Sequence, residues 1–374
     1  MAVEGAVRFC QNNFLGASYA TLTFTSAASG AAGANSVLPE RHKRWIPNGH
    51  FEVTSSNNTV YINDGSNKTV TLTVASYTSG SALASHIQTQ LNVSSTLWTC
   101  TYSSTNFKFT IGRSSGTRSL RFTQTTNAAW DMLGYTQVAD TDPGTGLTAS
   151  LVRRHTSEKV TVDFTTAVTP RFFGLIGPVD QDTYLTQNAT VTLRGNITNS
   201  FSSPAITITA ELQDDGSFFK FFDGLNTLYR YWQIEISDRE NDEDVISINQ
   251  LYLGDYVTLD TRNFSPGFSA ILEDPALVQS STSGVQYYRV LPKFWRFESL
   301  TAEYIDDTDL AELRRVFREL GTSVPLFVSL DPLKQVSSSI GEFTKYMRFE
   351  TGATFTHLFK DYYALNLTFR EVVG

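Results

Sequence analysis

The stretch YWQIEI, residues 231–236, alternates between apolar side chains and polar or amphipathic ones. Successive side chains of a strand point to opposite faces, so Trp232 and Ile234 share one face while Gln233 and Glu235 share the other. The pattern predicts a strand with one face in a core and the other toward solvent. Further strand-like stretches occur at residues 160–164, 189–193, 206–212 and 245–253. Several short strands separated by turn residues predict a β-sandwich or jelly roll.

The composition agrees with a mainly β protein that has packed cores. The chain has 374 residues, which is enough for roughly two or three domains. Hydrophobic residues make up 41% of the chain, and charged residues only 18%. This balance argues against global disorder. Aromatic residues reach 13% and predict rings in sheet cores and at protein interfaces.

One segment departs from the strand pattern. Leu83, Ile87 and Leu91 recur every four residues, which predicts a short amphipathic helix over residues 79–91 that ends at Asn92. Predicted strands flank this helix at residues 59–62, 69–74, 98–102 and 107–111. We therefore expect residues 47–155 to form a small α+β module, inserted into a sandwich made of residues 1–46 and 156–260.

The last part of the chain, residues 261–374, predicts a C-terminal α+β domain. Its clearest helix covers residues 306–320, where Leu310, Leu313 and Phe317 line one face and Gly321 stands at the C-cap position. Predicted strands lie at residues 287–291, 294–300, 324–330 and 365–370. The fold class is thus mainly β: an interrupted β-sandwich or jelly roll, an inserted module and a C-terminal α+β domain.

Charge, hydropathy and cysteine content limit the partners. The formal net charge is -8, so we expect no nucleic-acid partner. We expect no signal peptide, because residues 1–10 contain no basic region followed by an apolar core, and no membrane span, because no window of 18 apolar residues occurs. Cys10 and Cys100 are too few for a disulfide framework; we expect free thiols, with a single bridge as the alternative.

The chain lacks the usual catalytic motifs. We find no nucleophile elbow, no phosphate-binding loop, no dinucleotide fingerprint and no His-Glu-x-x-His zinc motif. We therefore expect no enzyme activity and name no catalytic, cofactor-binding or metal-binding residue. A glycan-cleaving enzyme, whose two carboxylates would come from distant parts of the sequence, is a disfavoured alternative.

Two clusters stand out as candidates for binding. Residues 238–244 form an acidic cluster, which we interpret as a solvated hairpin loop, with an ion or a cationic partner as the alternative. Residues 218–222, FFKFF, are followed by Tyr229, Tyr231 and Trp232. We expect these rings in a core or a subunit contact, and the alternative is a platform on which sugars stack.

Residues 70–135 resemble a strand–helix–strands module that is common in phage tail and other virion proteins. The resemblance rests on YT at residues 77–78, LA at 83–84, LN at 91–92, FKFTI at 107–111 and LGY at 133–135. It implies that the module belongs to a virion protein.

The later strands are similar to discoidin-like, galactose-binding-type jelly rolls, which occur in phage tail-tip proteins. The likeness lies in YRYW at residues 229–232, ISD at 236–238, Asn241 and LYLG at 251–254. The ending, YYAL at 362–365 and FREV at 369–372, resembles the closing strand of distal-tail or baseplate proteins. That family implies ring-shaped homo-oligomers between the tail tube and the host-binding tip.

These observations lead to two hypotheses. The first is a structural subunit of a bacteriophage virion, a tail-tip or baseplate (distal tail) ring component that links the tail tube to host-recognition parts. Its partners would be other copies of itself and neighbouring tail proteins; it would be made in the host cytoplasm and reside in the virion tail. The alternative is a carbohydrate-binding, receptor-recognition protein of the tail, whose partner would be a host surface glycan.

Overall fold

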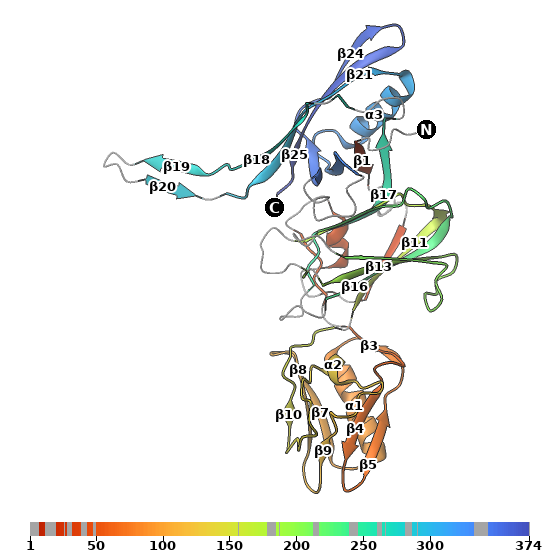
Figure 1. Cartoon of the computed structure of the whole chain (residues 1–374), viewed down its shortest axis with the longest axis vertical. Helices are drawn as coiled ribbons and strands as arrows, with labels where there is room; N and C mark the ends of the chain where they lie inside the picture. The colour runs from red at the N-terminus through yellow and green to blue at the C-terminus, as the bar shows by residue number, and fades with distance from the viewer. Residues whose placement is uncertain are drawn as a thin grey trace.

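The computed structural model describes residues 7–11, 20–25, 27, 32–38, 43–47, 50–155, 157–177, 185–186, 188–211, 217–238, 246–259, 264–265, 267–280, 286–289, 291–332 and 343–373. The chain is mainly β, as the alternating pattern predicts, and its longest ladders are antiparallel. We call residues 50–155, which belong to the predicted inserted module, the early module. In Figure 1 the early module, the central sheets and the C-terminal part follow one another along the long axis, and a hairpin projects to one side.

The central region is a sandwich of two sheets. The first is five-stranded, in the order β14 (Ile206–Glu211), β13 (Thr190–Asn196), β16 (Tyr229–Ser237), β11 (Glu158–Val168) and β2 (Ala20–Phe24). The second contributes β15 (Phe218–Phe221), β12 (Phe172–Ile176) and β17 (Gln250–Thr258). Trp232 and Ile234 of the first sheet share a buried core with Phe173 and Leu253 of the second. The predicted inward face of residues 231–236 is therefore confirmed.

The early module has its own core, built around one helix. Its elements are β3 (Phe51–Val53), β4 (Thr59–Asn63), β5 (Asn67–Thr71), β6 (Ala75–Tyr77), α1 (Gly80–Ser94), β7 (Trp98–Ser103), β8 (Lys108–Arg113), β9 (Ser119–Leu120), α2 (Trp130–Leu133) and β10 (Leu147–Thr148). Leu83, Ile87 and Leu91 are fully buried in this core, as their spacing predicts.

The helix begins where the sequence predicts but ends later. The Ser79 hydroxyl caps its first turn by accepting a hydrogen bond from the Ala82 amide at 3.1 Å. The prediction that Asn92 ends the helix is wrong, because the helix continues to Ser94. The Asn92 side chain instead bonds the backbone N–H and carbonyl of Trp98, at 3.1 and 2.9 Å, and so holds the start of β7 against the helix.

The C-terminal part extends the second sheet of the sandwich into a ten-stranded sheet. Its further strands are β1 (Arg8–Gln11), β18 (Ser269–Glu273), β21 (Phe294–Ile305), β22 (Leu326–Ser329), β23 (Thr344–Phe349), β24 (Thr354–Phe359) and β25 (Tyr362–Glu371). The helix α3 (Asp307–Leu320) packs on this sheet through Leu313 and Val316. Asp306 caps it and Gly321 ends it with a positive φ of 55°, so the helix predicted over residues 306–320 is confirmed.

Residues 1–46 contribute strands to two sheets. Strand β2 lies in the five-stranded sheet, and β1 pairs with β17 on one side and β22 on the other. Phe9 and Cys10 are both buried although they point to opposite faces. A strand buried on both faces fits the middle of a covered sheet. The sheet therefore runs continuously across the boundary expected at residue 260, and the three-domain division stays a prediction.

Candidate functional site

The aromatic stretch at residues 218–222 is core and not a surface. Phe218 and Phe222 lie in the sandwich core, while Phe219 and Phe221 pack on the other face of their sheet. Tyr229 and Trp232 are also buried. The expectation of a core is confirmed for these six rings, which therefore cannot form the sugar-stacking platform that we gave as the alternative. Tyr231 is instead half-buried, on the outward face of β16.

Asp238, the described residue of the acidic cluster, and the two cysteines are all buried. Asp238 accepts hydrogen bonds from the backbone N–H and the hydroxyl of Thr186, at 2.8 and 2.5 Å. It therefore links the end of β16 to the segment around residue 186. Residues 239–244 of the predicted loop lie outside the described residues. Cys10 and Cys100 are free, as expected, and burial raises the pKa of both thiols.

In the part of the chain that the structure describes, no group of His, Cys, Asp or Glu is placed to hold a metal ion. No helix there has both the length and the apolar content to cross a membrane.

A long hairpin, which we call the arm, leaves the C-terminal sheet. It consists of β18, β19 (Leu277–Ser280), β20 (Gln286–Arg289) and the start of β21. Strand β18 is the edge of the ten-stranded sheet, and β19 pairs with β20 alone. Figure 1 shows the outer half standing clear of the body. The arm therefore carries strand edges that no other described strand covers.

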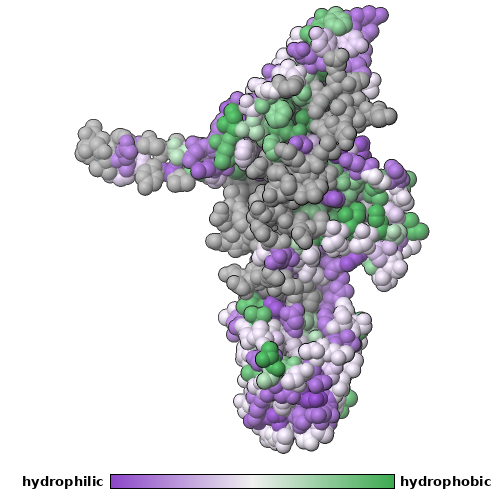
Figure 2. Space-filling model, in the orientation of Figure 1, coloured by the Kyte–Doolittle hydropathy of each residue, from purple (hydrophilic) through white to green (hydrophobic). Residues whose placement is uncertain are grey.

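Apolar side chains are exposed along the arm. Ile271 and Leu272 on β18 are 38% and 52% exposed, and Tyr287 on β20 is 64% exposed. Figure 2 shows hydrophobic surface where the arm meets the body. Exposed apolar groups beside uncovered strand edges are the features of a surface that pairs with another chain.

A second exposed aromatic group lies at the end of the β24–β25 hairpin. The rings of Tyr304 and Phe359 are 5.9 Å apart, and those of Phe359 and Tyr362 are 5.0 Å apart. Phe359 is 51% exposed, and Leu358 beside it is 41% exposed. Both apolar surfaces thus belong to the C-terminal part of the chain.

A cleft, which we call the polar cleft, lies over the outward face of the five-stranded sheet and has a volume of about 700 Å³. Its floor consists of side chains on adjacent strands. Gln233 of β16 stands opposite Arg194 of β13, which stands opposite Thr207 of β14. In the next row, Lys159 of β11 stands opposite Glu235 of β16. The strand alternation that buries Trp232 therefore also places these polar groups on one surface.

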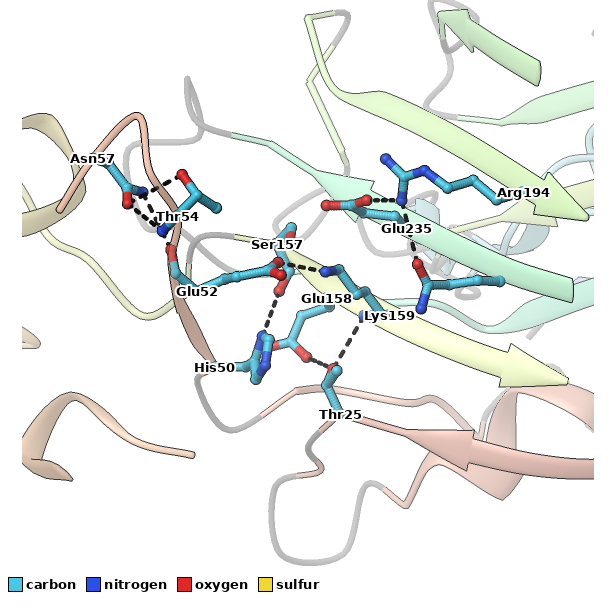
Figure 3. Close-up of polar contacts among 11 residues, drawn as sticks. Thr25, His50, Glu52, Thr54, Asn57, Ser157, Glu158, Lys159, Arg194 and Glu235 are labelled. Atoms are coloured by element: carbon cyan, nitrogen blue, oxygen red, sulfur yellow. Dashed lines mark hydrogen bonds and ion pairs between the residues drawn. The ribbon is translucent and has the colours of Figure 1, made fainter. Parts of the chain in front are cut away.

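The floor is held by hydrogen bonds and ion pairs between the strands (Figure 3). Nη1 of Arg194 donates to a carboxylate oxygen of Glu235 and, at 3.3 Å, to the side-chain oxygen of Gln233. Burial would raise the pKa of Glu235, but its hydrogen bond with Arg194 and the nearby charge of Lys159 outweigh this effect and lower the pKa. Glu235 is therefore an anion at neutral pH.

The early module supplies one wall of the polar cleft. Glu52 of β3 accepts a hydrogen bond from the Lys159 ammonium group, which ties the module to the floor. Asn57 bonds the carbonyl of Glu52 at 3.2 Å and the N–H of Thr54 at 2.7 Å, so it fixes this wall (Figure 3).

Two further hydrogen bonds secure the same junction. Nδ1 of His50 lies 3.1 Å from the carbonyl oxygen of Ser157. The Thr25 hydroxyl donates to Glu158 and accepts from the N–H of Lys159 at 3.1 Å. The strand that carries Lys159 is thus held from both sides.

The other wall is the connection between β13 and β14. It contributes Phe201, Ser202 and Pro204. Phe201 and Pro204 are half-buried, so an apolar side faces the charged floor. None of the residues that line the cleft was predicted as a site from the sequence. The one sequence signal for them is the polar face of residues 231–236, which contains Gln233 and Glu235.

Comparisons with known proteins give slight likenesses. No family model matches the chain, and no curated protein matches it. Among solved structures, CBM32-1 from a family 31 glycoside hydrolase of Clostridium perfringens is 13% identical, with a TM-score of 0.20 over 26% of this chain and 68% of that one. A fucolectin from striped bass (Morone saxatilis) serum is 10% identical, with a TM-score of 0.21 over 59% of this chain and 84% of that one. Likenesses this slight carry no argument about function.

Proposed function

We propose that the chain is a structural, non-enzymatic subunit of a bacteriophage virion, a ring component of the tail tip or baseplate. Its copies would pair with one another and with neighbouring tail proteins, and so link the tail tube to the parts that recognise the host. The single observation that carries the proposal is the arm, with its uncovered edges and exposed apolar side chains. The resemblance of residues 229–254 and 362–372 to tail proteins supports the virion as the setting.

The arm is poorly suited to a chain that acts alone. A two-stranded hairpin is marginally stable in water, because it buries little apolar surface. Its uncovered N–H and C=O groups are a template for strand pairing, and soluble proteins usually protect such edges. A neighbouring chain laid along the arm would satisfy these groups and cover Leu272 and Tyr287. In a closed ring of identical copies, the arm of each copy would pair with the next copy, so no arm would remain uncovered.

Shortening the arm is expected to abolish self-association. Glu273 pairs directly with Phe294, so an Asn-Gly turn can replace residues 274–293 and close the hairpin at this pair. We expect the wild-type chain to form a discrete multimer by light scattering after size exclusion, and the shortened chain to be a monomer with an unchanged circular dichroism spectrum. The reason is that the substitution removes β19 and β20, the outer half of the arm, and leaves only the short edge strand β18 for a neighbouring chain to pair with.

The control for this experiment is Val138→Ser, which changes an exposed apolar residue of the early module. Val138 is 88% exposed and lies outside the arm, so the multimer should persist in this variant. A wild-type chain that is monomeric at every concentration, or a shortened chain that still forms the multimer, would contradict the proposal.

A further inference from the structure

We propose that the polar cleft is a binding site for a neutral saccharide. This inference goes beyond the assembly role and does not depend on it, because the polar cleft and the arm are on different parts of the molecule. The cleft combines hydrogen-bonding groups of both kinds, balanced charges and an apolar wall.

The polar cleft presents donors and acceptors side by side. Arg194 and Lys159 can only donate, and Glu52 and Glu235 can only accept. Gln233 can do both, as can the hydroxyl groups of Thr54, Thr207 and Ser202 that also line the cleft. A sugar hydroxyl group donates one hydrogen bond and accepts others. Neighbouring hydroxyls on one ring would therefore find both kinds of partner within a short distance.

The charge balance selects a neutral ligand. Among the described residues, two cationic and two anionic side chains line the polar cleft, and they are already paired: Arg194 with Glu235, and Lys159 with Glu52. An anionic ligand would have to compete with a carboxylate for its cation, and it would meet the other carboxylate as a like charge. A cationic ligand faces the reverse problem. A neutral ligand can hydrogen-bond to these side chains without separating either ion pair.

The apolar wall suits the other side of a sugar ring. A pyranose carries C–H groups on its faces, and these pack on aromatic and proline rings. Phe201 and Pro204 supply such rings directly beside the charged floor. The volume of about 700 Å³ lies within the usual range for small-molecule sites and leaves room for more than one sugar ring.

The floor is also rigid enough to select a ligand. Arg194, Gln233 and Glu235 stand on β13 and β16, two adjacent inner strands of the five-stranded sheet, and their hydrogen bonds fix their positions. Groups held on strands by such contacts lose little freedom when a ligand binds. The floor of the cleft is therefore preorganised.

Binding can be measured on the full chain with defined sugars. We would titrate lactose, maltose, cellobiose and N,N′-diacetylchitobiose by calorimetry and screen an array of neutral, sialylated and sulfated glycans. We expect at least one neutral glycan to bind. Arg194→Gln and Phe201→Ala should each weaken that binding by about tenfold or more, because each removes a direct contact. Phe201 lies on a connecting loop, so its variant should fold even if Arg194→Gln does not.

The matched control is Arg230→Ala. Arg230 also stands on β16 and pairs with a carboxylate of β11, Asp163 at 2.7 Å, but it does not line the polar cleft. The Arg230→Ala variant should bind the same neutral glycan with the affinity of the wild type. The arm-shortened chain should also bind normally, so failure of the assembly proposal can be told apart from failure of this one. Three results would overturn the proposal: no neutral glycan binds, only sialylated or sulfated glycans bind, or affinity is unchanged in Phe201→Ala.

Discussion

Trp232→Ala is expected to lower the free energy of unfolding by about 4 kcal/mol, within the range for deleting a buried aromatic side chain. Trp232 is 0% exposed in the sandwich core. Its ring lies 6.5 Å from that of Phe222 in a stacked arrangement and 5.8 Å from that of Tyr229 edge to face. Alanine would leave a cavity between the two sheets that the surrounding strands cannot fill without moving.

Urea denaturation followed by circular dichroism would measure this loss. The control is Tyr231→Ala, which removes the adjacent aromatic ring from the outward face of the same strand. Tyr231 is only half-buried, so the loss should be at most about 1.5 kcal/mol. Equal losses in the two variants would contradict the assignment of the inward face. A large loss for Trp232→Ala would also show that substitutions of the buried rings in residues 218–232 destabilise the sandwich. Such substitutions therefore cannot serve as tests of sugar binding.

Gly134→Ala is expected to cost about 3 kcal/mol and to loosen the early module. Gly134 ends α2 with a φ of 82°, a conformation that residues with a Cβ seldom adopt. A Cβ at this position would lie 2.7 Å from the carbonyl oxygen of Leu151, which is backbone and cannot rotate away. The Leu151 N–H also donates to the Gly134 carbonyl at 3.0 Å, so any shift would strain this closing contact of the module.

Hydrogen exchange of the α1 amides would report this effect, because α1 lies in the core of the same module. The matched control is Gly144→Ala. Gly144 also has a positive φ, 57°, but nothing lies within 4 Å of the added Cβ. It should cost only about 1 kcal/mol, the conformational part alone. If both variants exchange equally fast, the contact with Leu151 has no energetic weight.

Local signals were enough to predict the two main helices and the strand at residues 231–236. The helix α3 has a signal for its start, its buried face and its end: the Asp306 cap, the spacing of Leu310 and Leu313, and Gly321 after its last turn. Each signal acts within a few residues, so no tertiary context is needed to recognise it. The end of α1 was missed because the Asn92 side chain bonds Trp98, a contact that helix rules do not include.

The arrangement of the sheets could not be predicted in the same way. Strand β1 pairs with Thr258 and Ser329, which are more than 200 residues away in sequence. Such pairings depend on which edges remain available after the rest has folded, and alternation alone does not identify partners. The arm is a similar case: strands were predicted near residues 287–300, but nothing in the pattern indicates that they stand away from the body.

Only part of the polar cleft, the outward face of residues 231–236, could be predicted from the sequence. The alternation of residues 231–236 placed Gln233 and Glu235 together on an outward face, which the structure confirms. Arg194 and Lys159 reach them only through the register of three strands, and Glu52 only through the position of the early module. A site assembled across strand pairings and between parts of the chain leaves no motif in the sequence.

If the chain is the virion protein that we propose, particles of the phage whose genome encodes it carry the chain. The most direct measurement of this claim is electron microscopy of such particles, labelled with gold-conjugated antibodies raised against the chain. The proposed function predicts that gold marks one end of the tail, where a ring component of the tip or baseplate would lie. Particles without gold, or gold confined to the capsid, would contradict the assignment to the tail.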